Sequence, residues 1–173
     1  PALASIADAP DGVALSNCFC QGRWTPAASA SMLTGTYLTT HRVGFEGEEV
    51  HRVPDGLSTV PELLGRQGYR TGCLSSNSYL SSATGLDRGF DRFLRPDKYD
   101  AVRNPGTVLR YLSRPRRYRG LSMGAKRLTL TYDLLTATAK RWIEEFARAD
   151  PFFLYLHYNT SHHTDRPKRA ESQ

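Results

Sequence analysis

The fold is decided by the stretch Phe152-Phe153-Leu154-Tyr155-Leu156-His157-Tyr158, which is almost entirely apolar or aromatic. Such a run predicts a β-strand that is buried on both faces of a parallel sheet, with His157 as a hydrogen-bonded core histidine. Residues 133–149 come directly before it and carry apolar side chains at helical spacing: Leu134, Leu135, Ala139, Trp142, Ile143 and Phe146. This spacing predicts an amphipathic helix that begins at Asp133 and leads into the strand.

A second helix and strand lie earlier in the chain. Residues 57–67 have apolar positions at helical spacing, with Ser58 as a plausible cap and Gly68 as the stop signal. Residues 69–75 then fit a strand, and the polar run at 76–78 predicts a loop at its carboxyl end. This loop contains Asn77.

A third strand and helix are predicted near the start of the chain. Residues 12–20 alternate weakly between apolar and polar side chains, which predicts a strand. The following run of helix formers begins at Pro26 and ends before Gly35, so Thr25 is expected at the N-terminus of a helix.

Three alternations of strand and helix predict an α/β fold with an open, mostly parallel sheet and helices on both sides. Ligands of such sheets collect at the carboxyl ends of the strands. That rule selects Thr25, Asn77 and the pair His162 and His163, which follows the last strand. A hydroxyl, an amide and imidazoles in one crevice would suit an anion.

Each of these residues also has a simpler structural interpretation. A threonine at a helix N-terminus either caps the helix or acts as a nucleophile, and the second role needs a metal or a base to remove its proton. Asn77 is either a turn former or a ligand contact. His41 and His51 fall in polar loops and are expected at the surface.

The chain has 173 residues and a formal net charge of +6, and its positive charge gathers in one stretch. Residues 95–131 are interpreted as a basic insertion or connecting segment, either solvated or a binding patch for polyanions. Its basic residues are Arg95, Lys98, Arg103, Arg110, Arg114, Arg116, Arg117, Arg119, Lys126 and Arg127.

Composition narrows the class of protein further. The length suits one domain, and no apolar run reaches the ~20 residues that span a bilayer, so no integral membrane association is expected. The 3 cysteines predict neither a disulfide framework nor a tetrahedral zinc site, and they favour a reducing compartment such as the cytoplasm. The first residues show no targeting signal, and we expect further sequence upstream of Pro1.

Residues 24–41 read Trp-Thr-Pro-Ala-Ala-Ser-Ala-Ser-Met-Leu-Thr-Gly-Thr-Tyr-Leu-Thr-Thr-His. This run resembles the sulfatase signature, Cys-x-Pro-Ser-Arg followed by Ala-Ser-Leu-Leu-Thr-Gly-Arg-Tyr-Pro and a His. Further matches follow in the family's order: Gly-Tyr-Arg-Thr at 68–71, Gly-Phe-Asp-Arg-Phe at 89–93 and Pro-Phe-Phe-Leu-Tyr-Leu at 151–156. Nearly the whole chain therefore resembles the sulfatase family of the alkaline-phosphatase-like superfamily.

The resemblance implies an enzyme in which a metal-bound nucleophile attacks sulfur or phosphorus. Thr25 stands where sulfatases carry the cysteine that is oxidised to formylglycine, so no formylglycine is expected and Thr25 becomes the nucleophile and a metal ligand. Ser29 replaces the signature arginine and is expected to contact substrate. The threonine favours phosphate or phosphonate esters over sulfate, and the loss of the arginine removes a cation that would orient the nucleophile and oppose developing charge.

Asn77 stands where the family has Lys-Trp-His, and it is expected to contact the anion as a neutral donor. His162 matches the family histidine that binds or protonates the ester, with His163 as the alternative if the loop is one residue longer. The family's acidic metal ligands would precede Pro1 and follow Gln173. The chain is thus expected to be an interior part of one catalytic domain, incomplete at both ends and inactive alone, whose divalent metal is Ca²⁺, with Mg²⁺, Mn²⁺ or Zn²⁺ as alternatives.

The sequence therefore predicts a sulfatase-like, metal-dependent hydrolase of small-molecule or glycan sulfate or phosphate esters. One alternative is a formylglycine-independent phosphodiesterase or phosphotransferase of the same superfamily. Another is a non-catalytic, degenerate domain that binds polyanions through its basic segment. No nucleic-acid partner is expected for the enzyme, and its oligomeric state is open.

Overall fold

A parallel sheet of three strands forms the centre of the molecule, in the order β4-β3-β5. The structure is a computed structural model that describes residues 5–6, 8–46, 49–95, 123–148 and 151–159. Strands β3 (Arg70–Ser75) and β5 (Phe152–His157) pair along their whole length, from Arg70 opposite Phe152 to Ser75 opposite His157. Both strands therefore end at the same edge of the sheet, which confirms the prediction of a parallel α/β sheet.

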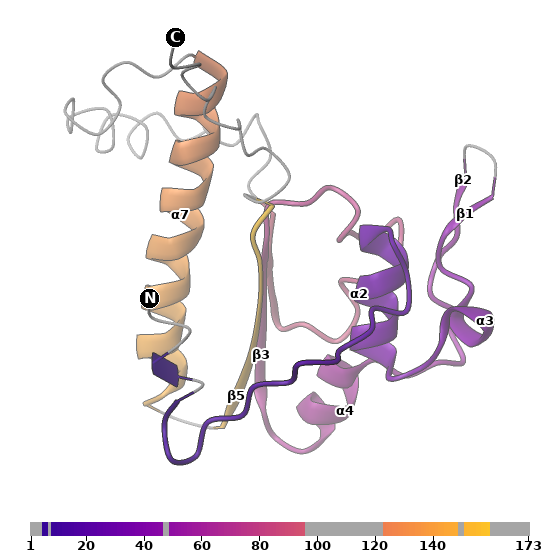
Figure 1. Cartoon of the computed structure of the whole chain (residues 1–173), viewed down its shortest axis with the longest axis horizontal. Coiled ribbons are helices and arrows are strands. Elements are labelled where there is room, and N and C mark those ends of the chain that lie inside the picture. Colours follow the sequence, from indigo (N-terminus) through magenta and orange to yellow (C-terminus); the bar gives the residue numbers. More distant parts are fainter. Residues whose placement is uncertain (1–4, 7, 47–48, 96–122, 149–150, 160–173) are drawn as a thin grey trace, which may run out of the picture.

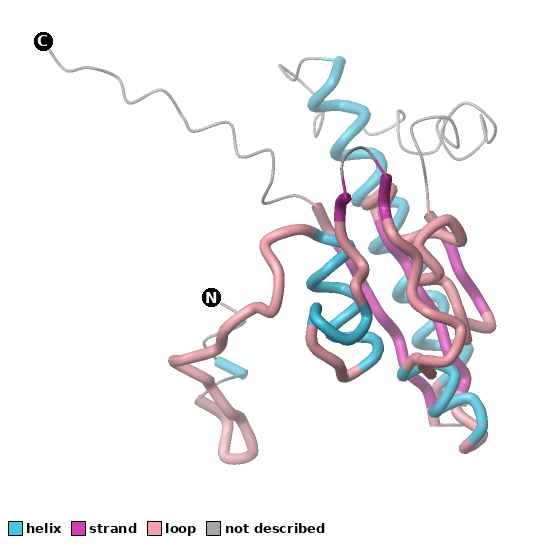
Figure 2. The backbone as a smooth tube through the Cα atoms, turned by 90° about the vertical axis from the view of Figure 1, so that its right-hand side faces the viewer, coloured by secondary structure: helices cyan, strands magenta, loops and turns pink. Residues whose placement is uncertain are grey.

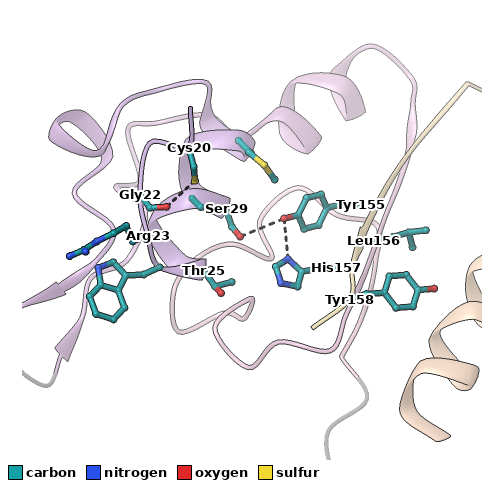
Figure 3. Close-up of a pocket in the computed structure, with 12 residues that line it drawn as sticks. Cys20, Gly22, Arg23, Thr25, Ser29, Tyr155, Leu156, His157 and Tyr158 are labelled. Carbon is teal, nitrogen blue, oxygen red and sulfur yellow. Dashed lines mark hydrogen bonds between the residues drawn. The ribbon is translucent and has the colours of Figure 1, made fainter. Parts of the chain in front are cut away.

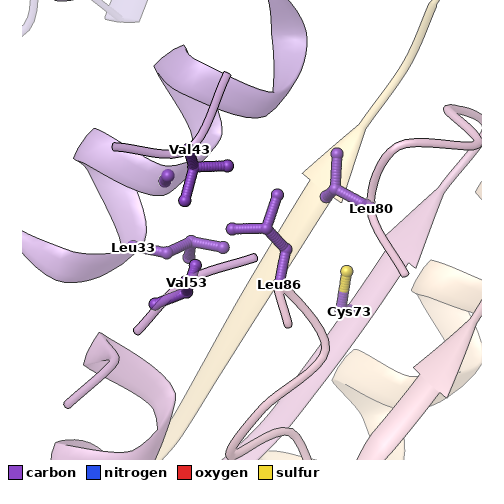
Figure 4. Packing of buried hydrophobic residues seen from close by; sticks show 7 residues of the cluster. Leu33, Val43, Val53, Cys73, Leu80 and Leu86 are labelled. Atoms are coloured by element: carbon purple, nitrogen blue, oxygen red, sulfur yellow. The ribbon is translucent and has the colours of Figure 1, made fainter. Parts of the chain in front are cut away.

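Helices cover both faces of this sheet, as predicted (Figure 1). Helix α7 (Met123–Phe146) lies on one face, and α2 (Thr25–Thr34) and α4 (Val60–Arg66) lie on the other. The two-residue period of the strands divides the core accordingly. The α7 face holds Leu74, Leu135, Ala139, Trp142 and Phe146. The opposite face holds Ala30, Leu33, Val43, Val53, Cys73, Leu80 and Leu86 (Figure 4).

Strand β5 is less buried than its composition predicts. Its residues are half-buried or exposed, and Leu156 is 39% exposed. The physical reason is its position: within the described residues β5 pairs with β3 alone and lies at an edge of the sheet (Figure 2). Side chains near its carboxyl end line a cavity beside α2.

The strand predicted at residues 12–20 is wrong. These residues form an irregular, exposed segment in which Val13 and Phe19 are 80% and 83% exposed. Their alternation is weak, and no described strand lies beside them to complete a ladder. Within the described residues, the free cysteines are Cys18 and Cys20 in this segment, both exposed, and the buried Cys73.

Helix α7 starts earlier than predicted, at Met123, so Asp133 lies inside it. The intervening residues are mostly good helix formers without proline, and the helix therefore extends through them. Of the predicted basic segment at 95–131, residues 96–122 lie outside the described residues and 123–131 form the start of α7.

In the part of the chain that the structure describes, no helix is both long and apolar enough to span a membrane.

Three short elements were not predicted: helix α3 (Leu38–His41), a hairpin of β1 (Phe45–Glu46) and β2 (Glu49–Val50), and strand β4 (Arg92–Leu94). Each has too few residues to show a hydrophobic period.

The expectation that His41 is a surface residue is also wrong. Its side chain is fully buried, its Nδ1 accepts the Val43 N–H at 2.9 Å, and its Nε2 lies 2.8 Å from the Ser31 hydroxyl. Burial lowers the pKa of His41, and an Nδ1 that accepts a hydrogen bond belongs to the neutral ring. His41 therefore fastens α3 to α2 as a structural residue. His51, half-buried, has its Nδ1 3.3 Å from the Arg42 carbonyl oxygen.

Helix α4 is capped by Thr59 rather than the predicted Ser58. Glu62 N–H donates to the Thr59 hydroxyl at 3.3 Å, and Thr59 N–H donates to the Glu62 carboxylate at 2.7 Å, which completes a capping box. Burial acts to raise the pKa of Glu62, but hydrogen bonds from Arg88 and Thr59 outweigh it and lower the pKa.

The same helix end is clamped by the loop that leads into β4. The Thr59 hydroxyl donates to the Arg88 carbonyl at 3.0 Å, and the Thr71 hydroxyl of β3 donates to the Gly89 carbonyl at 2.8 Å. Gly89 has φ of +81°, and a Cβ there would lie 2.4 Å from the Glu62 nitrogen. Glycine is required at this position for two reasons, the backbone angle and the close approach of α4.

We expect Gly89→Ala to destabilise the protein by about 3 kcal/mol, because a methyl group meets backbone atoms and φ is strained. Urea denaturation of the full-length protein measures this. Gly56→Ala is the matched control, because a Cβ there meets nothing within 4 Å. Equal stability of the two variants would contradict this account of the clamp.

Candidate functional site

Thr25 occupies the first position of helix α2. The N-cap is Trp24, whose backbone is extended and whose side chain makes no capping hydrogen bond, and Pro26 follows Thr25 in the first turn. Thr25 therefore does not cap this helix. Its hydroxyl is available for other contacts at a helix end whose dipole favours negative charge.

The hydroxyl of Thr25 is held by Asn77. Asn77 Nδ2 donates to Thr25 Oγ1 at 3.2 Å, and Asn77 Oδ1 accepts the Tyr79 N–H at 2.9 Å. The Asn77 N–H donates to the Ser75 hydroxyl at 3.0 Å, and the side chain is 7% exposed. Asn77 is thus both a turn former and a contact to Thr25. It joins the N-terminus of α2 to the carboxyl end of β3.

Ser29 lies one helical turn after Thr25, on the same face of α2. It is 2% exposed, and its Oγ lies 3.5 Å from the hydroxyl of Tyr155 on β5. The same Tyr155 hydroxyl lies 3.4 Å from Nδ1 of His157. These three side chains form a row of hydrogen-bonding groups between α2 and β5 (Figure 3).

A cavity of about 450 Å³ opens between the irregular segment before α2, α2 itself and the carboxyl end of β5 (Figure 3). Polar groups from Thr25, Ser29, Tyr155 and His157 meet there. The full lining is Cys20, Gly22, Arg23, Trp24, Thr25, Ala28, Ser29, Met32, Tyr155, Leu156, His157 and Tyr158.

Burial keeps the two titratable groups of β5 uncharged. It raises the pKa of the Tyr155 hydroxyl, against the hydrogen bond from Ser29 that lowers it, and it lowers the pKa of His157 from 6.5. Both side chains are therefore neutral at pH 7 and exchange hydrogen bonds rather than charge.

The structure brings together three of the residues selected from the sequence. Thr25 and Ser29 line the cavity, and Asn77 contacts Thr25. His162 and His163 lie outside the described residues, so their role stays a prediction.

Tyr155 and His157 were not selected as site residues. A signal for them existed in the strand itself. Phe153 and Tyr155 pack against the same core cluster as α2, and His157 is the next residue on that face and the last of the strand.

The described residues do not form a metal site by themselves. Among them there is no group of three or more His, Cys, Asp or Glu side chains placed to hold a metal ion. A hydroxyl and an amide from Thr25 and Asn77 do not satisfy a hard divalent cation, which requires carboxylate oxygens. The acidic ligands implied by the resemblance remain a prediction about residues outside this chain.

An open parallel α/β sheet, with helices on both faces and polar groups at its carboxyl edge, is the architecture of an α/β protein that binds its ligand at the ends of the strands. The family model described as Sulfatase matches residues 1–173. The chain belongs to the sulfatase family.

The structure is similar to the crystal structure of a phosphonate monoester hydrolase of Agrobacterium radiobacter, with a TM-score of 0.56 and 17% sequence identity. The match covers 84% of this chain and 33% of that one, so this chain spans about a third of the length of its structural neighbour. A comparison with curated proteins gives no match.

We expect Asn77→Ala to lower the free energy of unfolding by about 1–3 kcal/mol, because it removes the buried Asn77 amide that accepts the Tyr79 N–H and donates to Thr25. Urea denaturation of the full-length protein measures the change. Ser78→Ala, at the exposed neighbouring position, is the control and is expected to leave stability within about 0.5 kcal/mol of wild type. Equal effects of the two substitutions would show that Asn77 does not hold the loop.

Proposed function

We propose that the protein containing this chain is a sulfatase-family hydrolase of sulfate or phosphate esters in which Thr25 is the nucleophile. The observation that carries the proposal is the setting of Thr25. Its hydroxyl lies at the N-terminus of α2, accepts a hydrogen bond from Asn77 and lines a cavity at the carboxyl edge of a parallel sheet. Membership of the sulfatase family supports ester hydrolysis as the reaction.

The chemistry follows from this setting. The Thr25 oxygen attacks sulfur or phosphorus and passes its proton to a base, while the bond to the alcohol oxygen breaks and the alcohol leaves with a proton from an acid. Water then cleaves the ester formed on Thr25, which restores the threonine hydroxyl and releases the sulfate, phosphate or phosphonate. Backbone N–H groups at the helix end and the Asn77 amide are donors for the negative charge that the ester brings. His162, with His163 as the alternative, is proposed as the ligand or acid for the ester. The metal ion is proposed from the family alone, with Ca²⁺ first.

Phosphate and phosphonate monoesters are the preferred substrates in this proposal. Residue 25 is threonine, which cannot become formylglycine, so a simple alkoxide is the nucleophile available. The name of the structural neighbour, a phosphonate monoester hydrolase, favours the same class. Sulfate monoesters are the alternative substrate, and phosphate diesters are a second alternative.

We expect Thr25→Ala to reduce kcat/KM of the full-length protein by about 1000-fold or more, as loss of a nucleophile does in other hydrolases. Thr25→Ser keeps the hydroxyl and is expected to keep measurable turnover. Hydrolysis of aryl phosphate, aryl phosphonate, aryl sulfate and a phosphodiester, measured in parallel, ranks the substrates.

Thr39→Ala is the matched control, because this exposed threonine of α3 lies outside the cavity. It is expected to match wild type. Unchanged turnover in Thr25→Ala would refute the assignment of the nucleophile, and faster hydrolysis of aryl sulfate than of the phosphorus esters would refute the substrate preference.

A further inference from the structure

The two hydrogen bonds that link Ser29, Tyr155 and His157 can run in either of two directions, depending on which group donates the proton in each. Each hydroxyl has one proton to donate. If Ser29 donates to the Tyr155 oxygen, the Tyr155 proton is free to go to Nδ1 of His157, and every group in the row is used.

The reverse direction is less favourable. Were Nδ1 of His157 the donor, Tyr155 would donate to Ser29, and the proton of the buried Ser29 hydroxyl would have no acceptor among the described residues. Both directions make two hydrogen bonds, but the second leaves its unpaired proton on Ser29, which is 2% exposed, whereas the first leaves it on the half-buried ring of His157, where the cavity can supply a partner. The first direction therefore fixes the neutral tautomer of His157 that carries its proton on Nε2.

The position of His157 allows this tautomer to donate a hydrogen bond to a ligand in the cavity. Its Nδ1 is turned toward Tyr155, and the ring lines the same cavity as Thr25 (Figure 3). The backbone at this point is fixed, since the His157 carbonyl accepts the Ser76 N–H at 3.0 Å and the Ser76 hydroxyl lies 3.3 Å away. The imidazole is thus held at the carboxyl end of β5, with Nδ1 occupied and Nε2 left to meet a ligand.

We propose that His157 binds a tetrahedral oxyanion through its Nε2–H, as a neutral donor to a non-bridging oxygen of the ester, and that Tyr155 is the positioning residue that sets this tautomer. The inference rests on the proposed function, because it takes the cavity beside Thr25 as the place where the ester binds. It supplies a second neutral donor, besides Asn77, to a site whose sequence departs from the cationic residues of the sulfatase pattern.

Isothermal titration of the full-length protein with inorganic phosphate, and separately with sulfate, tests the binding role without turnover. We expect His157→Ala to weaken phosphate binding about tenfold or more, and His157→Gln, which restores an N–H donor, to recover most of it. Tyr155→Phe keeps the ring and the packing, and it is expected to weaken binding about three- to tenfold, as the loss of one positioning hydrogen bond does.

The matched controls are His51→Gln and Tyr37→Phe, which lie outside the cavity and are expected to bind phosphate as wild type does. Nitrogen-15 NMR of labelled histidine reads the tautomer directly. It is expected to show a proton on Nε2 of His157 in wild type and a mixture of tautomers in Tyr155→Phe.

Two results would overturn the inference: wild-type phosphate affinity in both His157→Ala and Tyr155→Phe, or a proton on Nδ1 of His157 in the wild-type protein. The Thr25→Ala variant tests the proposed function separately. If the proposed function is wrong, this variant retains hydrolysis, whatever phosphate affinity the His157 and Tyr155 variants have. Loss of hydrolysis in Thr25→Ala together with unchanged phosphate binding in the His157 variants would overturn the inference and leave the proposed function in place.

Discussion

The hydrogen bond from Asn77 to Thr25 connects the parts of the molecule on which the site depends. It spans the gap between the loop after β3 and the first residue of α2, two segments that are far apart in the sequence. Parallel pairing with β3 brings the end of β5 to the same edge, and so places Tyr155 and His157 beside α2. This amide fixes the end of α2 above that edge, beside the cavity.

Much of the fold follows from the sequence because its principal elements are long and strongly patterned. The apolar and aromatic run gives β5, the strand predicted at 69–75 gives β3, and proline and glycine mark the ends of α2. Strand β4 was missed because three residues cannot show a period. The strand expected at 12–20 fails for a different reason: its alternation is weak, and it has no partner strand among the described residues.

Part of the candidate site could be selected from the sequence, and there is a physical reason why the rest could not. Thr25 and Asn77 were found from sequence since each sits at the end of an element, where parallel sheets gather polar groups. Burial, by contrast, depends on the whole fold. His41 looked like a surface residue and is buried, whereas His157 looked like a core residue and lines the cavity. Neither placement can be deduced from nearby residues alone.

The most direct test of the central claim is to look for the covalent intermediate on Thr25. The full-length protein would be mixed with an aryl phosphate or phosphonate, quenched rapidly in acid, digested and analysed by mass spectrometry. The account predicts a phosphoryl or phosphonyl group on the peptide that contains Thr25, and its absence in Thr25→Ala. Turnover with the group on another residue, or with no adduct under conditions that trap one on a known enzyme of this kind, would contradict it.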